Sequence, residues 1–217
     1  MGLEFTQAVE AAAQRAAVRQ AEAWRAAQEA ARAAAGLGTP LFDCLLRSQF
    51  PDSPDHAEAL CAAMGRAVEG DGPAVPIVIA GPGGCGKTVV ARVLEALFPP
   101  AAVMYVNSTR GPRTGIFVVH EEPDFDLVRA LSGGTLPVIA VSNHTPPPRA
   151  ATDGPIALFS FDRRVAEPNH LLLEDILSTE LTAVRTRVLQ ASCALRDRAE
   201  AAFGGDVWAA LPAAVIA

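Results

Sequence analysis

Apolar residues in the middle of the chain form short runs that are bounded by turn residues and separated by helical stretches. The runs are rich in β-branched residues and fall at 76–80, 102–106, 116–120, 136–141 and 156–161. Runs that are apolar on both faces, and that helical crossovers connect, are typical of strands buried in a parallel sheet. The pattern therefore predicts an α/β fold with a five-stranded parallel sheet and helices on both of its faces.

Helical patterns occupy both ends of the chain. Residues 5–35 are rich in alanine and contain no proline or glycine, which predicts a helix that either faces solvent or serves as an oligomerisation element. Two shorter helices are expected near 41–49 and 54–68. A long helix is expected from Leu171 to about Ala202, because its apolar residues follow a 4-3-4-3-4 spacing. That stripe suits either packing in the core or a seam between subunits.

The composition is that of a globular chain and argues against several classes of function. Half of the 217 residues are apolar and 19% are charged, which is sufficient for a proper core. A net charge of −6 argues against a protein that mainly coats nucleic acid. The four cysteines show no metal-ligand spacing, and neither a signal pattern nor a membrane-length apolar run is present. We therefore expect a soluble intracellular protein with reduced thiols and no membrane partner.

The clearest chemical signal is a glycine-rich loop directly after the first apolar run. It follows the spacing G-x-x-x-x-G-K-[ST], and the residues expected to bind nucleotide are Gly81, Pro82, Gly83, Gly84, Cys85, Gly86, Lys87, Thr88 and Val89. Such loops bind phosphates through backbone N–H groups at a helix N-terminus. Lys87, which is the only lysine in the chain, is expected to neutralise the β- and γ-phosphates of ATP. The Thr88 hydroxyl is expected to bind Mg²⁺.

Two later strands are expected to end in polar residues that complete this site. Glu121 and Glu122 follow the third apolar run, and Asn143 follows the fourth. The carboxyl ends of parallel strands meet at one edge of a sheet, so we expect these side chains beside the phosphates. Glu121 is assigned to Mg²⁺ and Glu122 to polarising the attacking water, and the reverse order is also open. With Asn143 orienting that water or contacting the γ-phosphate, the predicted catalytic residues are Glu122, Lys87 and Asn143.

In combination, these motifs resemble the AAA+-type core of superfamily 3 helicases, in particular the replication initiator (non-structural) proteins of parvoviruses. The segments that carry the resemblance are Ile77–Thr88, Tyr105–Thr109, Phe117–Pro123, Leu131–Gly134, Pro137–Asn143 and Phe159–Val165. The resemblance implies a P-loop NTPase sheet in the order 5-1-4-3-2. It also implies that subunits assemble into a ring, with a hexamer as the expected size, and that ATP binds at the boundaries between subunits. It divides the chain into a P-loop ATPase core at 51–168, a helical N-terminal segment at 1–50 and a helical C-terminal segment at 169–217. If the protein is viral, as the resemblance implies, we expect it to be located in the host nucleus.

Two features of that family are missing from this chain. The family carries a DNA-contacting lysine on a β-hairpin between the acid pair and the next strand. Here residues 133–137 lead almost at once into that strand, and they contain no lysine. The family also places an arginine finger before its last strand, where this chain has Ala157. Arg149, Arg163 or Arg164 of a neighbouring subunit are the alternatives for that role.

Three functions fit these observations. The first is a compact ATPase of this descent, with slow Mg²⁺-dependent hydrolysis and little or no DNA unwinding. The second is a viral regulatory or accessory protein that binds ATP without hydrolysing it and co-assembles with another replication protein. The third is a small kinase. A kinase should carry an arginine-rich lid late in the chain, but here the late arginines fall within the leucine-striped helix, which argues against this function. The expected partners are ATP, further copies of the chain or a replication protein, and DNA only weakly.

Overall fold

The computed structural model describes residues 38–70, 76–105, 116–119, 123–130, 137–148, 154–165 and 169–216. The predicted helix at 5–35, the acid pair Glu121 and Glu122, and Arg149 lie outside the described residues. The described helices are α2 (Pro40–Gln49), α3 (Pro54–Glu69), α4 (Lys87–Ala96), α5 (Phe125–Ala130), α6 (Leu172–Thr179) and α7 (Leu181–Phe203), with short 3₁₀ turns η1 (Pro100–Ala102) and η2 (Ala213–Val215). The described strands are β1 (Ile77–Ala80), β2 (Val103–Tyr105), β3 (Ile116–Val119), β4 (Val138–Ser142) and β5 (Ala157–Ser160).

The strands form one parallel sheet in the order β2-β3-β4-β1-β5, which reads 5-1-4-3-2 from its other edge. β1 lies between β4 and β5, and its last residue, Ala80, is in register with Ser142 and Ser160. All four side chains of β1 are buried. A strand buried on both faces has no polar side, which is why its sequence shows a continuous apolar run. The predicted α/β class is confirmed.

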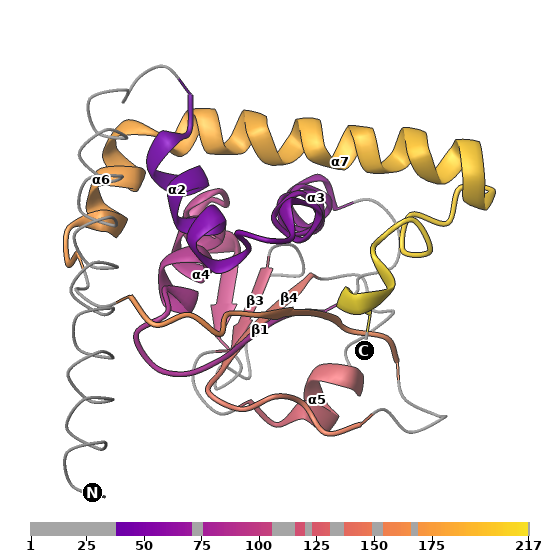
Figure 1. Cartoon of the computed structure of the whole chain (residues 1–217), viewed down its shortest axis with the longest axis horizontal. Helices are drawn as coiled ribbons and strands as arrows, with labels where there is room; N and C mark the ends of the chain where they lie inside the picture. The colour runs from indigo at the N-terminus through magenta and orange to yellow at the C-terminus, as the bar shows by residue number, and fades with distance from the viewer. Residues whose placement is uncertain are drawn as a thin grey trace, which may run out of the picture.

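Helices cover both faces of the sheet (Figure 1). α2, α3 and α4 lie on one side, where Ile77 and Ile79 of β1 join the main hydrophobic cluster of the molecule. α5 lies on the other side, where Val78 packs in a smaller cluster with Val128. This division follows from the strand geometry, because successive side chains of a strand point to opposite faces.

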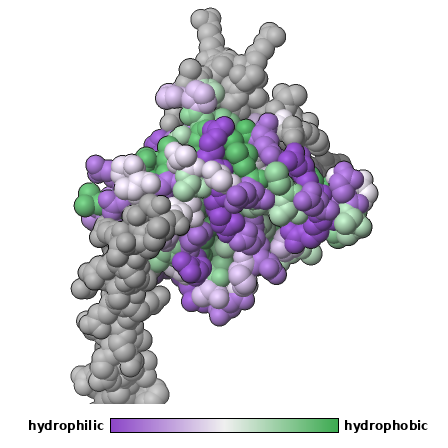
Figure 2. All heavy atoms as spheres, turned by 90° about the horizontal axis from the view of Figure 1, so that it is seen from above, coloured by the Kyte–Doolittle hydropathy of each residue, from purple (hydrophilic) through white to green (hydrophobic). Residues whose placement is uncertain are grey.

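α7 packs along α3 and forms an outer layer above the sheet (Figure 1). Its apolar stripe is fully buried at Val184, Val188 and Leu195. The two helices approach so closely at Gly65 of α3 that a Cβ atom there would lie 2.1 Å from the Val188 carbonyl oxygen. Seen from the α7 side, the coloured surface is mostly hydrophilic, with smaller hydrophobic areas (Figure 2). The stripe therefore packs in the core of the chain.

The sequence predicted one helix from Leu171 to about Ala202, and this was wrong at Glu180, where α6 and α7 separate. The Glu180 side chain is fully buried, and its carboxylate oxygens accept hydrogen bonds from the N–H groups of Leu41 (2.8 Å) and Phe42 (3.0 Å). These amides belong to the first turn of α2, where backbone donors lack partners within the helix. A glutamate is a good helix former, so no local signal revealed the break; the contact with α2 explains it.

Glu180 should make the stability of the protein depend on pH. Burial raises the pKa of its carboxyl group, and the two backbone amides oppose this effect to a smaller extent. A raised folded-state pKa contributes stability that is present below the ordinary glutamate pKa and is lost as the pH rises through the folded value. Relative to Glu180→Gln, the wild-type free energy of unfolding should therefore increase between about pH 7 and pH 4. Urea denaturation of both proteins at several pH values measures this difference, and a difference that is constant with pH would contradict the assignment.

The described residues contain four free cysteines, of which Cys61 and Cys85 are buried and Cys193 is exposed. Burial raises the pKa of the Cys61 thiol to about 12, so this side chain stays protonated at neutral pH. In the part of the chain that the structure describes, no group of His, Cys, Asp and Glu side chains is arranged to hold a metal ion by itself. No helix among the same residues is both long and apolar enough to cross a membrane.

Candidate functional site

The glycine loop, residues 81–86, connects the carboxyl end of β1 to α4, and neighbouring strands hold its first residue in place. The Gly81 N–H donates to the carbonyl oxygen of Ser142 (3.1 Å), and the Phe161 N–H donates to that of Ala80 (2.7 Å). Gly81 has a φ of +147°, and a Cβ atom there would lie 2.0 Å from the Phe161 carbonyl oxygen. Only glycine fits between these two extensions of the sheet. The loop therefore starts from a fixed position at the centre of the fold.

The end of the loop is fixed by α2. Gly86 has a φ of +91°, and a Cβ atom there would lie 2.7 Å from Cδ1 of Leu45. Within the described part of the chain, the backbone N–H groups of residues 83–88 donate to no protein acceptor. They surround the N-terminus of α4, where the helix dipole adds partial positive charge. Free amides and a helix N-terminus together form an anion-binding site.

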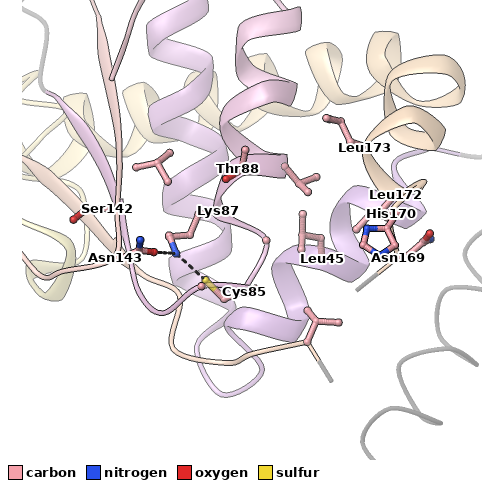
Figure 3. A pocket seen from close by; sticks show the side chains of 16 residues that line it. Leu45, Cys85, Lys87, Thr88, Ser142, Asn143, Asn169, His170, Leu172 and Leu173 are labelled. Atoms are coloured by element: carbon pink, nitrogen blue, oxygen red, sulfur yellow. Dashed lines mark hydrogen bonds between the residues drawn. The ribbon is translucent and has the colours of Figure 1, made fainter. Parts of the chain in front are cut away.

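The Lys87 ammonium group lies in this loop and is bonded to it (Figure 3). The side chain is only 6% exposed. Its Nζ donates to the carbonyl oxygens of Gly81 (2.6 Å) and Pro82 (2.8 Å) and to Oδ1 of Asn143 (3.3 Å). Nζ also lies 3.4 Å from Sγ of Cys85, so the three protons of the ammonium group are shared among four acceptors from the loop and Asn143. An anion in the loop would replace the neutral carbonyl acceptors with charge-assisted hydrogen bonds, which are stronger.

Asn143 connects the loop to the neighbouring strand, because it directly follows β4. Its side chain is exposed at the carboxyl end of the sheet and points toward Lys87 (Figure 3). The adjacent Ser142 is buried, and its Oγ accepts the His144 N–H at 2.9 Å. This turn holds the residue after β4 beside the loop. The predicted neighbourhood of Lys87 and Asn143, 56 positions apart in sequence, is therefore present in the structure.

A cavity of about 490 Å³ opens beside the loop, which is within the usual range for small-molecule sites. One end is lined by residues 83–89 together with Ser142 and Asn143. Thr88 is exposed to this space, one residue into α4 (Figure 3). The rest of the lining includes residues that sequence reasoning missed, namely Leu45, Val165, Asn169, His170, Leu172 and Leu173. They come from α2, the segment after β5 and α6, and no spacing in the sequence connects them to the loop.

The predicted site residues are thus brought together in part. Seven of the nine loop positions line the cavity, while Gly81 and Pro82 contribute the carbonyl groups that hold Lys87. Cys85 is fully buried and its Sγ donates to the Pro82 carbonyl oxygen (2.9 Å). Because Glu121 and Glu122 lie outside the described residues, their assigned roles stay predictions. β3, which ends at Val119, pairs with β4 on the side away from β1.

The arginines proposed for a finger role differ in their surroundings. Arg163 forms an ion pair with Asp52 (3.0 Å) in which both side chains are well exposed. Exposed ion pairs contribute little stability, so this contact leaves Arg163 free to exchange partners. Arg164 is exposed and follows directly in the chain. A role of either residue at the site of a neighbouring subunit stays a prediction.

Comparison with solved structures finds similar folds. The apo C-terminal region of NrS-1 (residues 305–718 of that protein) matches with a TM-score of 0.52 and 14% sequence identity, over 76% of this chain and 54% of that one. A second apo structure of the same region matches with a TM-score of 0.50 and 15% identity, over 76% and 54%. The chain therefore spans about half the length of these structures, and the likeness concerns the fold alone. No family model and no curated protein matches the chain.

Proposed function

We propose that the chain is a P-loop ATP-binding protein related to superfamily 3 replication helicases, and that it hydrolyses ATP slowly in the presence of Mg²⁺. The observation that carries the proposal is the position of Lys87. Its ammonium group is buried in a loop whose backbone amides donate to no acceptor in the described part of the chain, and it is bonded to Asn143 at the end of the neighbouring strand β4. Triphosphates need this combination of a point charge, amide donors and a polar side chain on the neighbouring strand.

The size of the cavity supports a nucleotide rather than a simple anion. Phosphates account for the end formed by residues 83–88. The side of the cavity away from Lys87 adds the aliphatic side chains of Leu172 and Leu173 and the imidazole of His170 (Figure 3). An apolar end with few polar groups suits a base and a sugar. ATP extends across both ends in this proposal.

The chain has residues that fit a magnesium ion and an attacking water. The Thr88 hydroxyl is exposed at the phosphate end of the cavity, which is where a magnesium ligand is required. Glu121 is the second proposed ligand. Bound Mg²⁺ supplies charge neutralisation for phosphoryl transfer. Glu122 polarises the attacking water, while Asn143 orients it and Lys87 holds the terminal phosphates.

Assembly and DNA unwinding follow from the proposed relationship. The sheet order of 5-1-4-3-2 is the order that the superfamily 3 resemblance implies. That relationship supports a ring of identical subunits, or a mixed assembly with another replication protein, in which a neighbour completes each ATP site. Unwinding of DNA by the isolated chain should be weak or absent, since the family's DNA-contacting lysine has no counterpart here.

Phosphate release from ATP tests the enzymatic part of the proposal. The wild-type protein should release phosphate slowly with Mg²⁺, and Glu122→Gln should lower turnover by about 100-fold or more while ATP binding persists, because a positioned base contributes at least that much. Glu200→Gln, on the exposed surface of α7, makes the same chemical change away from the cavity and should leave turnover unchanged. Assays with and without single-stranded DNA, and subunit counts with and without ATP, complete the test.

The outcomes separate the three functions. Tight ATP binding without phosphate release would replace the ATPase by a regulatory ATP-binding protein. Transfer of the phosphate to an added small acceptor would identify a kinase. Turnover that is equal in the wild type and Glu122→Gln would remove Glu122 from the mechanism.

A further inference from the structure

The segment after β5, residues 161–165, runs beside the glycine loop. Its first residue bonds the residue before the loop, and its last residue bonds the middle of the loop. At its start, the Phe161 N–H donates to the Ala80 carbonyl oxygen, just before the loop. At its end, the Val165 N–H donates to the Gly84 carbonyl oxygen at 3.1 Å. We name residues 161–165 the strap. It is the described segment that bonds to the middle of the loop from outside, so its position affects the loop's conformation.

The middle of the strap is held by one side chain of α2. Gln49 is 6% exposed, and its amide group bonds both backbone groups of Arg163. Its Nε2 donates to the Arg163 carbonyl oxygen (2.9 Å), and its Oε1 accepts the Arg163 N–H (3.3 Å). This pairing also assigns the amide orientation, because only the oxygen can accept an N–H. A buried side chain with two such bonds fixes the backbone of the strap two residues before Val165.

The bond from Val165 determines the direction of one amide of the glycine loop. The Gly84 carbonyl and the Cys85 N–H belong to the same peptide plane and point in opposite directions, because the bond is trans. When the carbonyl oxygen is held by Val165, the Cys85 N–H must point away from that bond. This N–H is one of the loop amides that donate to no acceptor in the described part of the chain. The strap therefore orients a donor that is available to a phosphate.

We propose that Gln49 is a positioning residue for phosphate binding, which acts through the strap on the Gly84–Cys85 peptide of the glycine loop. The inference rests on the proposed function, since it needs a phosphate-containing ligand in the cavity. Without Gln49, the strap loses both bonds at Arg163 and the Val165–Gly84 bond becomes easier to break. The Gly84–Cys85 peptide can then rotate, and its amide no longer meets the ligand in one fixed orientation.

The test measures the dissociation constants of ATP and of inorganic tripolyphosphate, at a temperature where circular dichroism shows every variant folded. Gln49→Ala is expected to raise both constants about tenfold, in line with the loss of roughly one fixed hydrogen bond. Gln49→Glu keeps the side-chain volume but places a carboxylate oxygen against the Arg163 carbonyl oxygen. It should therefore also raise the dissociation constants of both ligands. Asp52→Ala is the matched control: it removes the side-chain ion pair of the same Arg163 and should change binding less than about twofold.

A double-mutant cycle distinguishes positioning from general destabilisation. Val165→Pro removes the N–H that bonds Gly84, so it breaks the same connection one step later. If Gln49 acts through the strap, the double variant Gln49→Ala, Val165→Pro should raise the dissociation constant of tripolyphosphate no more than the single variant with the larger effect does. Effects that multiply in the double variant would overturn the proposal.

Two further outcomes are informative in different ways. Wild-type affinity for both ligands in Gln49→Ala would overturn this inference and leave the proposed function standing. A wild-type chain that binds neither ATP nor tripolyphosphate would overturn both.

Discussion

Replacement of Lys87 by alanine is expected to weaken the binding of ATP by about 100-fold or more. The ammonium group is buried in the glycine loop, and hydrogen bonds to charged groups contribute about 1.5–3 kcal/mol each. A loss of about 3 kcal/mol corresponds to a factor of roughly 100 in the dissociation constant. Isothermal titration calorimetry with ATP and Mg²⁺ measures the effect. The same loss of affinity is expected for tripolyphosphate, because in this proposal Lys87 binds the phosphate groups and not the base or the sugar.

Two control variants make the Lys87 result specific. Lys87→Arg keeps the charge, but a planar guanidinium is bulkier than an ammonium group and cannot make the same bonds to Gly81 and Pro82, so ATP affinity should not recover. Arg92→Ala removes a partly exposed positive charge from the same helix and should leave ATP affinity nearly unchanged. If Lys87→Ala bound ATP as tightly as the wild type, the phosphates would not lie in this loop.

Gly81→Ala is expected to lower the free energy of unfolding by about 3–5 kcal/mol. The new Cβ atom would lie 2.0 Å from the Phe161 carbonyl oxygen, and the φ of +147° is strained for any residue with a side chain. The Phe161 carbonyl is a backbone group directly after β5, and the Phe161 N–H is bonded to Ala80 of the central strand β1, so a side-chain movement cannot relieve the clash. Urea denaturation followed by circular dichroism measures the loss.

Gly84→Ala is the matched comparison within the same loop. Gly84 also has a positive φ, of +79°, but a Cβ atom there would meet no atom within 4 Å. Only the strain of placing alanine in a left-handed backbone conformation remains, so the free energy of unfolding should fall by about 1–2 kcal/mol. Equal losses in the two variants would show that the approach of Phe161 to Gly81 does not limit the choice of residue.

The strands and the loop were predictable because their signals are local. The run Ile77–Ala80 is apolar at every position, which is required of a strand between two neighbours and under helices on both faces. The stop at Gly81 and the start of α4 at Lys87 follow from the spacing of glycines around one lysine. The contact of Asn143 with Lys87 was also predictable, because parallel strands end at the same edge.

Glu180, Gln49 and the far end of the cavity had no such signal. Glu180 breaks a helix that its neighbours in sequence favour, because its carboxylate bonds amides 139 and 138 positions earlier. Gln49 resembles any polar residue at the end of a helix, yet it holds the backbone of Arg163, 114 positions later. A polar side chain that bonds a distant backbone follows no periodicity, so pattern and spacing cannot reveal it.

The amino-acid sequence alone therefore determined the class of the fold, the place of the glycine loop between a buried strand and a helix, and the position of Lys87 at the end of that loop. These depend on burial patterns and on residues that are close together in the chain. The tertiary structure decided which helices hold the loop, which residues line the rest of the cavity and where the last helix breaks. Each of these depends on contacts between segments far apart in the sequence, such as Glu180 with Leu41, Gln49 with Arg163 and Val165 with Gly84, which only the folded chain brings within hydrogen-bond distance.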